Sequence, residues 1–547
     1  MTGWAYADIW EEIAAAVPGR PALIQGDRVV RWGEFDARAN AIAAFLLKAG
    51  LGRQSKMAAF LYNAPEYLES YYAAFKAGLV PVNTNYRYGD QELTYLFDNA
   101  DAEAVVFHAS FAPLVDRIRG RLPQVKAWLA VPQPGHPAPD WASDYERIAA
   151  VGAPRTIAPW GRSGDDLLFM YTGGTTGMPK GVMWRQEDLF KVLGGGGNLI
   201  EALPPLETPA EAGRRALAAE RGEMQGPRLM MAAAPLMHAT AQFTALSVLT
   251  GGGAVAVLPS QRFNAAELWS EVERLGVTSI SIVGQAFAAP MLDALEAEPG
   301  RWNLSSLRRI GSSGTVWSHE NKQGLLGHLP ADCVLFDSLG SSEAVGVGGS
   351  QSSAGAAAET ARFVVGPNTA AFTEDGRRIE PGSGERGLLA LAGFLPTGYY
   401  KDPEKSARTF REFEGRRWSV PGDFATVEAD GTLKLLGRGS QVINTGGEKV
   451  FPEEVEEALK RHAAVRDAVV VGVPDARFGE RICAIVDLRP GAPAPSLAEL
   501  AAHVRQHLAD YKAPRELVLA PAARSPNGKV DYKAAKALAL EALKLPA

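Results

Sequence analysis

Residues 171–182 read Tyr-Thr-Gly-Gly-Thr-Thr-Gly-Met-Pro-Lys-Gly-Val and gather four glycines, three threonines and one lysine into one short stretch. The stretch follows the apolar segment 167–170 and precedes further β-branched and aromatic residues, a pattern that predicts a strand, a loop and another ordered element. Glycines let backbone N–H groups approach an anion, while threonine hydroxyls and a lysine ammonium donate further hydrogen bonds. The stretch therefore predicts a loop that binds the phosphates of a nucleotide.

This stretch does not match the P-loop of nucleoside triphosphatases. The P-loop motif places a Ser or Thr directly after its lysine to bind Mg²⁺, whereas Lys180 lies between Pro179 and Gly181. A glycine-rich surface turn is the alternative interpretation, but it explains neither the hydroxyls nor the lysine. We therefore favour phosphate binding by a loop that is not a P-loop.

The composition is typical of a globular protein with more than one domain. The chain has 547 residues, of which 46% are hydrophobic and 22% charged, so burial of a core is not limiting. A net charge of −6 argues against nucleic acid as a partner. The only cysteines, Cys333 and Cys483, lie in no disulfide or metal-binding pattern, which is typical of the cytoplasm. No signal peptide or transmembrane segment is predicted, because no run approaches about 20 apolar residues.

Strand-like and helix-like segments alternate along most of the chain. We expect strands at 104–108, 252–259 and 277–283 and helices at 265–275 and 287–295. This alternation predicts βαβ units and an α/β fold with largely parallel sheets. The proline-rich segment 131–140 and the polar segment 204–227 are expected to be surface excursions outside the core.

A domain boundary is predicted near residue 437. A strand-like run ends there, and a polar, glycine-containing segment follows it up to Gly446 and Gly447. Pro452 then begins an acidic helix, and strands at 468–473 and 482–488 with a helix at 497–508 complete a compact unit. We therefore expect a large N-terminal domain, residues 1–437, and a small α+β domain, residues 438–547.

Further polar turns follow strand-like runs. They are Arg308–Gly314, Asp337–Glu343, Pro421-Gly-Asp423, Gly437-Arg438 and Ser525-Pro-Asn-Gly-Lys529. With these motifs in this order, the sequence closely resembles the adenylate-forming superfamily of acyl-CoA synthetases, luciferases and peptide-synthetase adenylation domains, over essentially its whole length. Within the superfamily, residues 171–184 and 444–456 are most similar to bacterial acyl-CoA synthetases of the steroid and sterol side-chain type.

The resemblance implies a reaction in two steps. A carboxylate attacks the α-phosphate of ATP to form an acyl-adenylate and pyrophosphate, and the thiol of coenzyme A then displaces AMP. The implied substrates are ATP, coenzyme A and a small-molecule carboxylic acid, with Mg²⁺ as the metal. The resemblance also implies that the small domain is mobile and rotates between the two steps, because its lysine would occupy the place that the thiol must enter.

The same resemblance assigns roles to individual residues. Lys529, Glu343, Thr172 and His238 are implied in catalysis, and Glu343 with Thr172 in metal binding. The nucleotide and coenzyme A would be bound by Thr172, Gly173, Gly174, Thr175, Thr176, Gly177, Lys180, Ser313, Gly314, Asp337, Ser338, Leu339, Gly340, Ser342, Asp423, Arg438, Gly446, Gly447 and Lys529. The acyl pocket would include His238, Gly195, Gly284 and Gln285, and the glycines at 194–197 leave room for a bulky acid.

Each of these residues also has a purely structural explanation. Glu343 follows a serine that can cap a helix, Asp423 follows Pro-Gly in an ordinary turn, and a lone lysine such as Lys529 is usually solvated. His238 is equally consistent with a core histidine, and the glycines at 194–197 with a flexible loop. The joint occurrence of the motifs in family order favours the functional interpretation.

Two positions depart from the family pattern. Leu339 stands where the family commonly has an aromatic residue that stacks on adenine, and the hinge after Arg438 reads Gly439-Ser440-Gln441. We therefore predict an α/β acyl-CoA ligase acting on a fatty or steroid-type acid in the cytoplasm, with a homodimer as an open alternative to a monomer. An adenylating enzyme that loads a carrier-protein pantetheine and a non-catalytic nucleotide-binding regulator are the other hypotheses.

Overall fold

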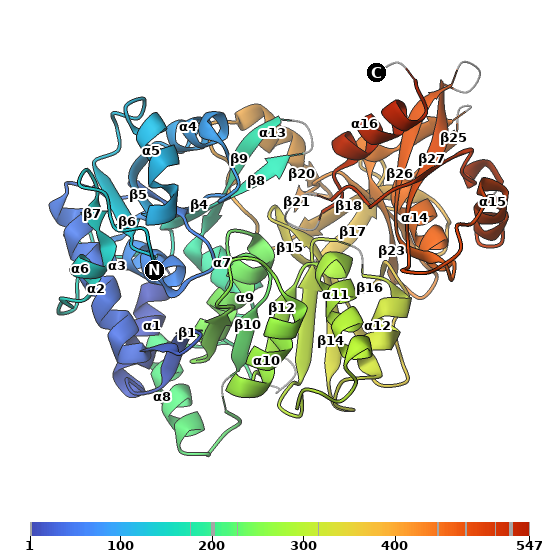
Figure 1. Ribbon diagram of the computed structural model, residues 1–547. Coiled ribbons are helices and arrows are strands. Elements are labelled where there is room, and N and C mark those ends of the chain that lie inside the picture. Colours follow the sequence, from blue (N-terminus) through green and yellow to red (C-terminus); the bar gives the residue numbers. More distant parts are fainter. Residues whose placement is uncertain are drawn as a thin grey trace.

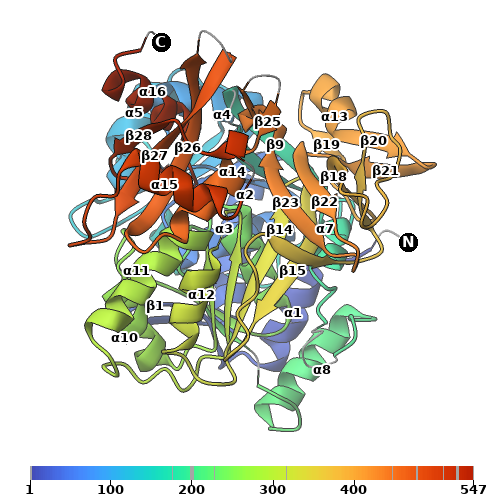
Figure 2. The same ribbon diagram turned by 90° about the vertical axis from the view of Figure 1, so that its right-hand side faces the viewer.

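The computed structural model of the protein describes residues 3–174, 177–197, 203–226, 228–315, 317–445, 448–475, 479–508, 510–524 and 529–545. Its N-terminal part contains two large sheets with helices around and between them, and its C-terminal part forms a smaller unit beside them (Figures 1 and 2). The alternation of strands and helices confirms the predicted α/β fold class.

The first sheet carries the glycine-threonine stretch. Its strand order is β19-β9-β8-β4-β3-β5-β6-β7, with bounds β3 (Lys56–Phe60), β4 (Val80–Asn83), β5 (Ala102–His108), β6 (Ala127–Val131), β7 (Ser143–Asp144), β8 (Leu167–Gly174), β9 (Gly177–Arg185) and β19 (Gly398–Tyr399). Strands β8 to β7 in this order are parallel, whereas β9 is antiparallel to β8. Met57 and Ala59 face one core and Ala58 and Phe60 the other, so the sheet is covered on both faces.

The second sheet provides most of the cavity wall described below. Its order is β2-β1-β11-β10-β12-β13-β14-β15-β16-β23-β22-β18-β21-β20, with β17 paired to β18. The bounds are β1 (Pro21–Gln25), β2 (Arg28–Arg31), β10 (Leu229–Ala232), β11 (Ala254–Val257), β12 (Ser279–Ile282), β13 (Arg309–Ser313), β14 (Val334–Ser341), β15 (Ala344–Ser352), β16 (Arg362–Val365), β17 (Thr369–Phe372), β18 (Arg386–Ala392), β20 (Phe410–Phe413), β21 (Arg416–Ser419), β22 (Asp423–Val427) and β23 (Leu433–Arg438). From β1 to β14 neighbouring strands are parallel, and from β14 to β23 they are antiparallel.

Helices cover both large sheets and fill the space between them. They are α1 (Tyr6–Ala16), α2 (Trp32–Lys48), α3 (Pro65–Ala77), α4 (Asp90–Asn99), α5 (Ala112–Arg119), α6 (Tyr145–Ala149), α7 (Gln186–Val192), α8 (Pro209–Glu220), α9 (Ala239–Thr250), α10 (Ala265–Leu275), α11 (Gly284–Ala297), α12 (His319–Leu326) and α13 (Pro403–Thr409). Helix α3 is buried along its whole length. Helix α10 begins at Asn264, whose side chain accepts a hydrogen bond from the Glu267 backbone, and ends at the left-handed Gly276, so the predicted range 265–275 is confirmed.

The C-terminal unit has its own sheet and its own apolar cores. Its strands follow the order β25-β24-β27-β26, with β28 beside β27, and their bounds are β24 (Ile443–Thr445), β25 (Glu448–Val450), β26 (Val465–Asp475), β27 (Gly479–Leu488) and β28 (Glu516–Leu519). Helices α14 (Pro452–Lys460) and α15 (Leu497–Arg505) cover one face and α16 (Tyr532–Ala542) the other. The exact boundary at residues 437/438 stays a prediction.

The segment 204–227 is more ordered than the sequence predicted. It contains helix α8, which packs against α1 at Gly213, where a Cβ would come within 2.7 Å of the Glu12 carbonyl oxygen. Ala212 and Ala216 are buried in the same contact. The expectation of a surface excursion was therefore wrong for this helix, because small residues rather than large apolar ones form its packed face.

Candidate active site

A large cavity lies where the N-terminal sheets meet the C-terminal unit. Its volume is about 1420 Å³, and its walls come from β8, from β10 and β12 to β15, from α9 and from residues 529–536. Thr172, His238, Ser313, Gly314 and Lys529, which are far apart in the sequence, all line this cavity. The fold therefore brings together residues to which the sequence assigned phosphate, acyl and adenylation roles.

The glycine-threonine stretch forms a hairpin between β8 and β9. Thr172 is paired with Lys180 across the two strands, and Gly173 and Gly174 end β8 where Gly177 begins β9. Thr172 lines the cavity, so the hairpin presents its loop to the same space as the other predicted residues. Thr175 and Thr176 lie outside the described residues.

Lys180 forms an ion pair with Asp402 and is not among the residues that line the cavity. Asp402 also accepts a hydrogen bond of 2.9 Å from the Lys405 backbone and so caps α13. The hydrogen bond from Lys180 holds the pKa of Asp402 below its usual range. The lysine of the predicted phosphate loop is thus held by a carboxylate on a neighbouring element.

The C-terminal ends of β13 and β14 form the floor of the cavity near Lys529. Ser313 ends β13 and Gly314 directly follows it, while Ser338 and Gly340 lie on the cavity face of β14. Ser342, in the turn after β14, lines the same region. Gly314 has a φ of +93°, a conformation that favours glycine. These positions match the predicted nucleotide-binding turns.

Asp337 and Leu339 do not line the cavity. Successive side chains of a strand point to opposite faces, so these two residues lie behind the face that Ser338 and Gly340 form. Asp337 is buried 3.5 Å from the Lys322 ammonium, and burial raises its pKa to about 6. Leu339 packs against the apolar cluster that contains Val347. Their predicted role in nucleotide binding stays a prediction, and the side chains that face the cavity are those of their neighbours.

Glu343 is fixed by two neighbouring elements. The Tyr399 hydroxyl of β19 donates a hydrogen bond of 2.8 Å to Glu343 Oε1, and the Trp184 indole of β9 donates one of 2.9 Å to the Ser342 carbonyl. Glu343 is 8% exposed. Because β9 is also one strand of the glycine-threonine hairpin, Glu343 and the hairpin are connected through β9.

Glu343 is not among the residues that line the cavity, but its carboxylate suits a Mg²⁺ ion that is shared with a nucleotide. Within the described ranges, no three His, Cys, Asp or Glu side chains form a metal cage. Mg²⁺ needs no such cage, because it keeps several waters and binds one or two carboxylates together with substrate phosphates. Tyr399 binds one oxygen of Glu343, and no hydrogen bond to the second oxygen occurs in the part of the chain that the structure describes. Glu343, with the Thr172 hydroxyl, would hold the ion.

His238 and Lys529 lie close together in the cavity. Burial and the positive charge of Lys529 lower the pKa of His238 to about 3, so its imidazole is neutral. Its buried Nε2 atom has no hydrogen-bond partner among the described residues. A Cβ on Gly314 would be 3.8 Å from Lys529 Cε, which places the lysine over the end of β13. A neutral hydrogen-bonding group and a cation therefore face the same space.

Other predicted nucleotide and coenzyme A residues lie at the junction with the C-terminal unit. Asp423 on β22 is directly opposite Arg438 on β23. The side chain of Arg438 is not described, and Gly446 and Gly447 lie outside the described residues. Their proposed contacts with ribose and pantetheine stay predictions.

The predicted acyl residues are only partly at the cavity. Of the glycines at 194–197, Gly194 and Gly197 line it, whereas a Cβ on Gly195 would meet the Pro205 side chain at 3.1 Å. Gly284 and Gln285 do not line the cavity. The Gly284 N–H donates to Ser312 Oγ at 2.9 Å, and Gln285 Oε1 accepts from the Ser318 backbone at 3.3 Å. These two residues hold the start of α11 and α12, and their role in acyl binding stays a prediction.

Sequence reasoning missed much of the cavity wall. Arg228, Phe243, Ser247, Arg309 and Phe336 all line it. The alternation of Arg309, Gly311 and Ser313 on one face of a strand is a signal that the sequence contained, but the neighbours of that strand become known only from the sheet order.

Comparisons with known proteins agree with this architecture. The family model described as "AMP-binding enzyme" matches residues 10–399, and "AMP-binding enzyme C-terminal domain" matches residues 454–529. Among solved structures, the anthranilate CoA ligase AuaEII in complex with anthranoyl-AMP has a TM-score of 0.83 at 21% identity and covers 100% of this chain and 99% of its own. A benzoate CoA ligase from Burkholderia xenovorans LB400 has a TM-score of 0.78 at 22% identity, covering 98% of this chain and 100% of its own. These structures share the fold.

Characterised relatives match the chain over nearly its whole length. A medium/long-chain-fatty-acid–CoA/3-oxocholest-4-en-26-oate–CoA ligase of Mycolicibacterium smegmatis is 40% identical over 97% of this chain and 95% of its own. A 3-oxocholest-4-en-26-oate–CoA ligase of Rhodococcus rhodochrous is 41% identical over the same shares. The medium-chain acyl-CoA ligase Mig of Mycobacterium avium is 38% identical over 98% of both chains. The chain belongs to the AMP-binding, adenylate-forming enzyme superfamily.

Proposed function

We propose that this protein is an ATP-dependent acyl-CoA ligase for hydrophobic carboxylic acids of the fatty or steroid type. The observation that carries the proposal is the position of Lys529, which lies beside His238 and Gly314 in the cavity that Thr172 also lines. A lysine from the C-terminal unit at this place supplies a cation where a carboxylate and an α-phosphate would meet. Relatives named as fatty-acid and steroid-acid CoA ligases support the substrate class.

In the first step, a carboxylate oxygen of the acid attacks the α-phosphorus of ATP, and the bond to the pyrophosphate oxygen breaks. A carboxylate is a competent nucleophile, so positioning and neutralisation of charge account for most of the acceleration. Lys529 donates hydrogen bonds to the α-phosphate and to the attacking carboxylate. His238 is neutral at physiological pH because of burial and Lys529, so it contributes a hydrogen bond without adding a second positive charge.

The pyrophosphate leaving group is held by the β8–β9 hairpin. Thr172 and the backbone of Gly173, Gly174 and Gly177 bind its oxygens, and we include Thr175, Thr176 and Lys180 in the same role. Mg²⁺, when bound through Glu343, supplies further neutralisation of the phosphate charge. Ser313, Gly314, Ser338, Gly340 and Ser342 form the surface on which the adenosine rests, and Asp423 and Arg438 bind its ribose.

In the second step, the thiol of coenzyme A attacks the acyl carbonyl, and AMP leaves with the electrons of the acyl–phosphate bond. Lys529 occupies the space beside that carbonyl, so the unit 438–547 must turn to remove it. The 3₁₀ turn Gly439–Gln441 lies directly after β23 and is the segment where we place this rotation. Gly446 and Gly447 would then approach the pantetheine.

The proposal is tested by supplying two thiols to the enzyme with ATP, Mg²⁺ and a long-chain acid. We expect mass spectrometry to detect acyl-CoA when coenzyme A is supplied and no acylated carrier protein when a holo carrier protein is supplied. Transfer to the carrier protein alone would establish the carrier-loading alternative. Binding of ATP without formation of any adenylate would establish a regulator and reject the ligase.

Location and assembly are also proposals. Cys333 and Cys483 are both buried and form no disulfide, which supports a reducing compartment such as the cytoplasm. No described helix is long and apolar enough to cross a membrane. The homodimer considered from the sequence stays a prediction, which sedimentation velocity tests.

A further inference from the structure

Two arginines lie at the end of the cavity remote from Lys529. Arg309 begins β13 and Arg228 directly precedes β10, and both line the cavity. Ser279 of β12 is paired with Arg309 on one side and with Met230 on the other. Arg228 precedes Met230 by two residues, so the two arginines lie in neighbouring rows of side chains across the sheet. Ser313 lies four residues further along β13, about 13 Å away at the rise of a strand.

The wall between the two ends is formed by small side chains. Gly311 lies on the cavity face of β13 between Arg309 and Ser313, and a Cβ there would meet only the Ile280 carbonyl oxygen, at 3.9 Å. Ser281 and Ser338 of the adjacent strands line the same region. An elongated molecule whose carboxyl lies at Lys529 therefore has a path along this face to the arginines.

Arg309 is positioned without a carboxylate. Its guanidinium lies 4.4 Å from the centre of the Phe336 ring, and within the described residues it forms no ion pair. Phe336 in turn packs against Gly349, where a Cβ would be 2.6 Å from the ring. Burial and the charge of Arg228 lower the pKa of Arg309 to about 10, so the site is electropositive and poorly solvated. Such a site favours a ligand that brings negative charge or a strong hydrogen-bond acceptor.

The adjacent residue Arg308 differs from Arg309, because it pairs with a carboxylate. Arg308 is half exposed and pairs with Asp332 at 3.2 Å. Arg308 is not among the residues that line the cavity. Arg309 is thus a cation directed into the cavity, whereas Arg308 is an ordinary surface cation.

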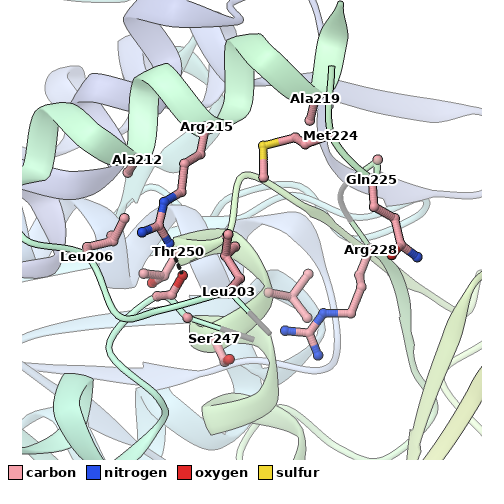
Figure 3. A pocket seen from close by; sticks show the side chains of 15 residues that line it. Leu203, Leu206, Ala212, Arg215, Ala219, Met224, Gln225, Arg228, Ser247 and Thr250 are labelled. Carbon is pink, nitrogen blue, oxygen red and sulfur yellow. Dashed lines mark hydrogen bonds between the residues drawn. The ribbon is translucent and has the colours of Figure 1, made fainter. Parts of the chain in front are cut away.

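Arg228 closes the remote end of the cavity. It also lines a second cavity of about 50 Å³, which shares Gly197 and Ser247 with the large one and lies between α8 and α9. Figure 3 shows its guanidinium extending into this space in the direction of Ser247. Arg215, on the other side, is paired with Glu211 at 2.5 Å and donates to the Pro204 carbonyl at 2.8 Å. Arg215 therefore stabilises α8 and the loop before it. The large cavity ends at Arg228.

We propose that Arg309, together with Arg228, binds an acceptor oxygen at the end of the acid that is remote from its reactive carboxyl. A ketone and a second carboxylate both present such an acceptor oxygen, and either could lie at the remote end of a long acid, whether rigid or extended. This inference rests on the proposed ligase function and adds to it a determinant of substrate choice. Planar guanidinium groups suit both kinds of oxygen, because they donate two hydrogen bonds in a fixed geometry.

Two matched pairs of acids test the proposal. One pair is 3-oxocholest-4-en-26-oic acid and the same acid without its ketone, and the other is hexadecanedioic acid and hexadecanoic acid. We expect kcat/KM of the wild-type enzyme, measured by pyrophosphate release with coenzyme A, to be about 10- to 100-fold higher for the oxygenated member of at least one pair, as expected for a hydrogen bond to a charged group. A preference within the steroid pair identifies a ketone, and one within the linear pair a carboxylate.

The variants separate this role from a structural one. The measured ratio is kcat/KM for the oxygenated acid divided by kcat/KM for its matched partner. Arg309→Leu should lower this ratio to near one or below, and Arg309→Lys should retain part of the preference. Arg308→Gln should keep the wild-type ratio. Ratios near one for both pairs in the wild-type enzyme would overturn the inference without any variant and leave the ligase function intact. A wild-type preference that survives in an active Arg309→Leu enzyme would overturn it as well. Absence of pyrophosphate release with every acid would instead reject the proposed function itself.

Discussion

Lys529 of the C-terminal unit lies over Gly314 at the end of β13, at a distance where a Cβ on Gly314 would be 3.8 Å from Lys529 Cε. The contact joins two parts of the chain that are more than two hundred residues apart in the sequence. It also places an ammonium group beside His238, whose pKa falls to about 3 through burial and this charge. This position is the one that the proposed role of Lys529 in adenylate formation requires.

Replacement of Lys529 should impair one of the two half-reactions. Lys529→Ala removes the cation that neutralises the α-phosphate, so adenylation should slow by about a hundredfold or more, the effect typical of losing one such group. Thioester formation from supplied acyl-adenylate should keep its rate, because the lysine is absent from that step. Lys544→Ala, an exposed lysine at the other end of the same unit, is the control. Equal loss in both half-reactions would contradict the assigned role.

Filling the path along β13 should shorten the accepted acid. Gly311→Leu places a side chain in open space between Arg309 and Ser313. We expect kcat/KM for long-chain or steroid acids to fall by about tenfold or more, while short acids are retained, since an excluded group in a tight pocket costs a few kcal/mol. Gly120→Leu at the exposed end of α5, where a Cβ meets nothing within 4 Å, is the matched control. An equal loss for all acids would indicate a general folding defect.

The ion pair between Lys180 and Asp402 should compete with ATP for the lysine. Asp402→Asn keeps the acceptor that caps α13 but removes the charge that holds Lys180. The KM for ATP should fall by a few-fold, because a partly exposed pair contributes about 1 kcal/mol or less. Thermal stability should change little for the same reason. A raised KM would show that the pair instead positions Lys180 for the phosphates.

Stability should decline as the pH falls below the ordinary pKa of histidine. Burial lowers the pKa of His108 to about 3, and its Nδ1 accepts a hydrogen bond of 3.0 Å from the Tyr62 backbone. In the unfolded chain the His108 imidazole binds a proton near pH 6.5, whereas in the folded chain it stays neutral down to about pH 3. Its contribution to folding stability is therefore fully present above about pH 6.5 and is lost progressively toward about pH 3. His108→Asn keeps a hydrogen-bond acceptor that does not titrate. It should lower the slope of the free energy of unfolding against pH by about 1.4 kcal/mol per pH unit. Urea unfolding at about pH 7 and about pH 5 measures it, and equal slopes in both proteins would contradict the assignment.

Local signals predicted many elements but not their neighbours. Helix α10 was predicted to the residue because its amphipathic pattern lies between Asn264 and Gly276, which cap it. Helix α8 was missed because its contact with α1 depends on Gly213 and on alanines, which carry no strong apolar signal. The family motifs placed Lys529 and Thr172 at the cavity, and both line it.

Side-chain direction explains why some predicted site residues do not line the cavity. Asp337 and Leu339 occupy the face of β14 that packs on the core, and only the alternation of the strand in place decides this. Gln285 is engaged by the Ser318 backbone, a contact between separate elements that no local pattern indicates. Arg228 and Arg309 come together through the order β10-β12-β13, which the sequence does not contain.

Pyrophosphate release from ATP and Mg²⁺, measured over a panel of fatty, aryl and steroid acids with and without coenzyme A, decides whether the protein is a ligase of this type. A ligase of the proposed type should release pyrophosphate with fatty or steroid acids and turn over repeatedly only when coenzyme A is present. Release confined to aryl acids would contradict the substrate class. Binding of ATP with no pyrophosphate release for any acid would contradict the ligase function itself.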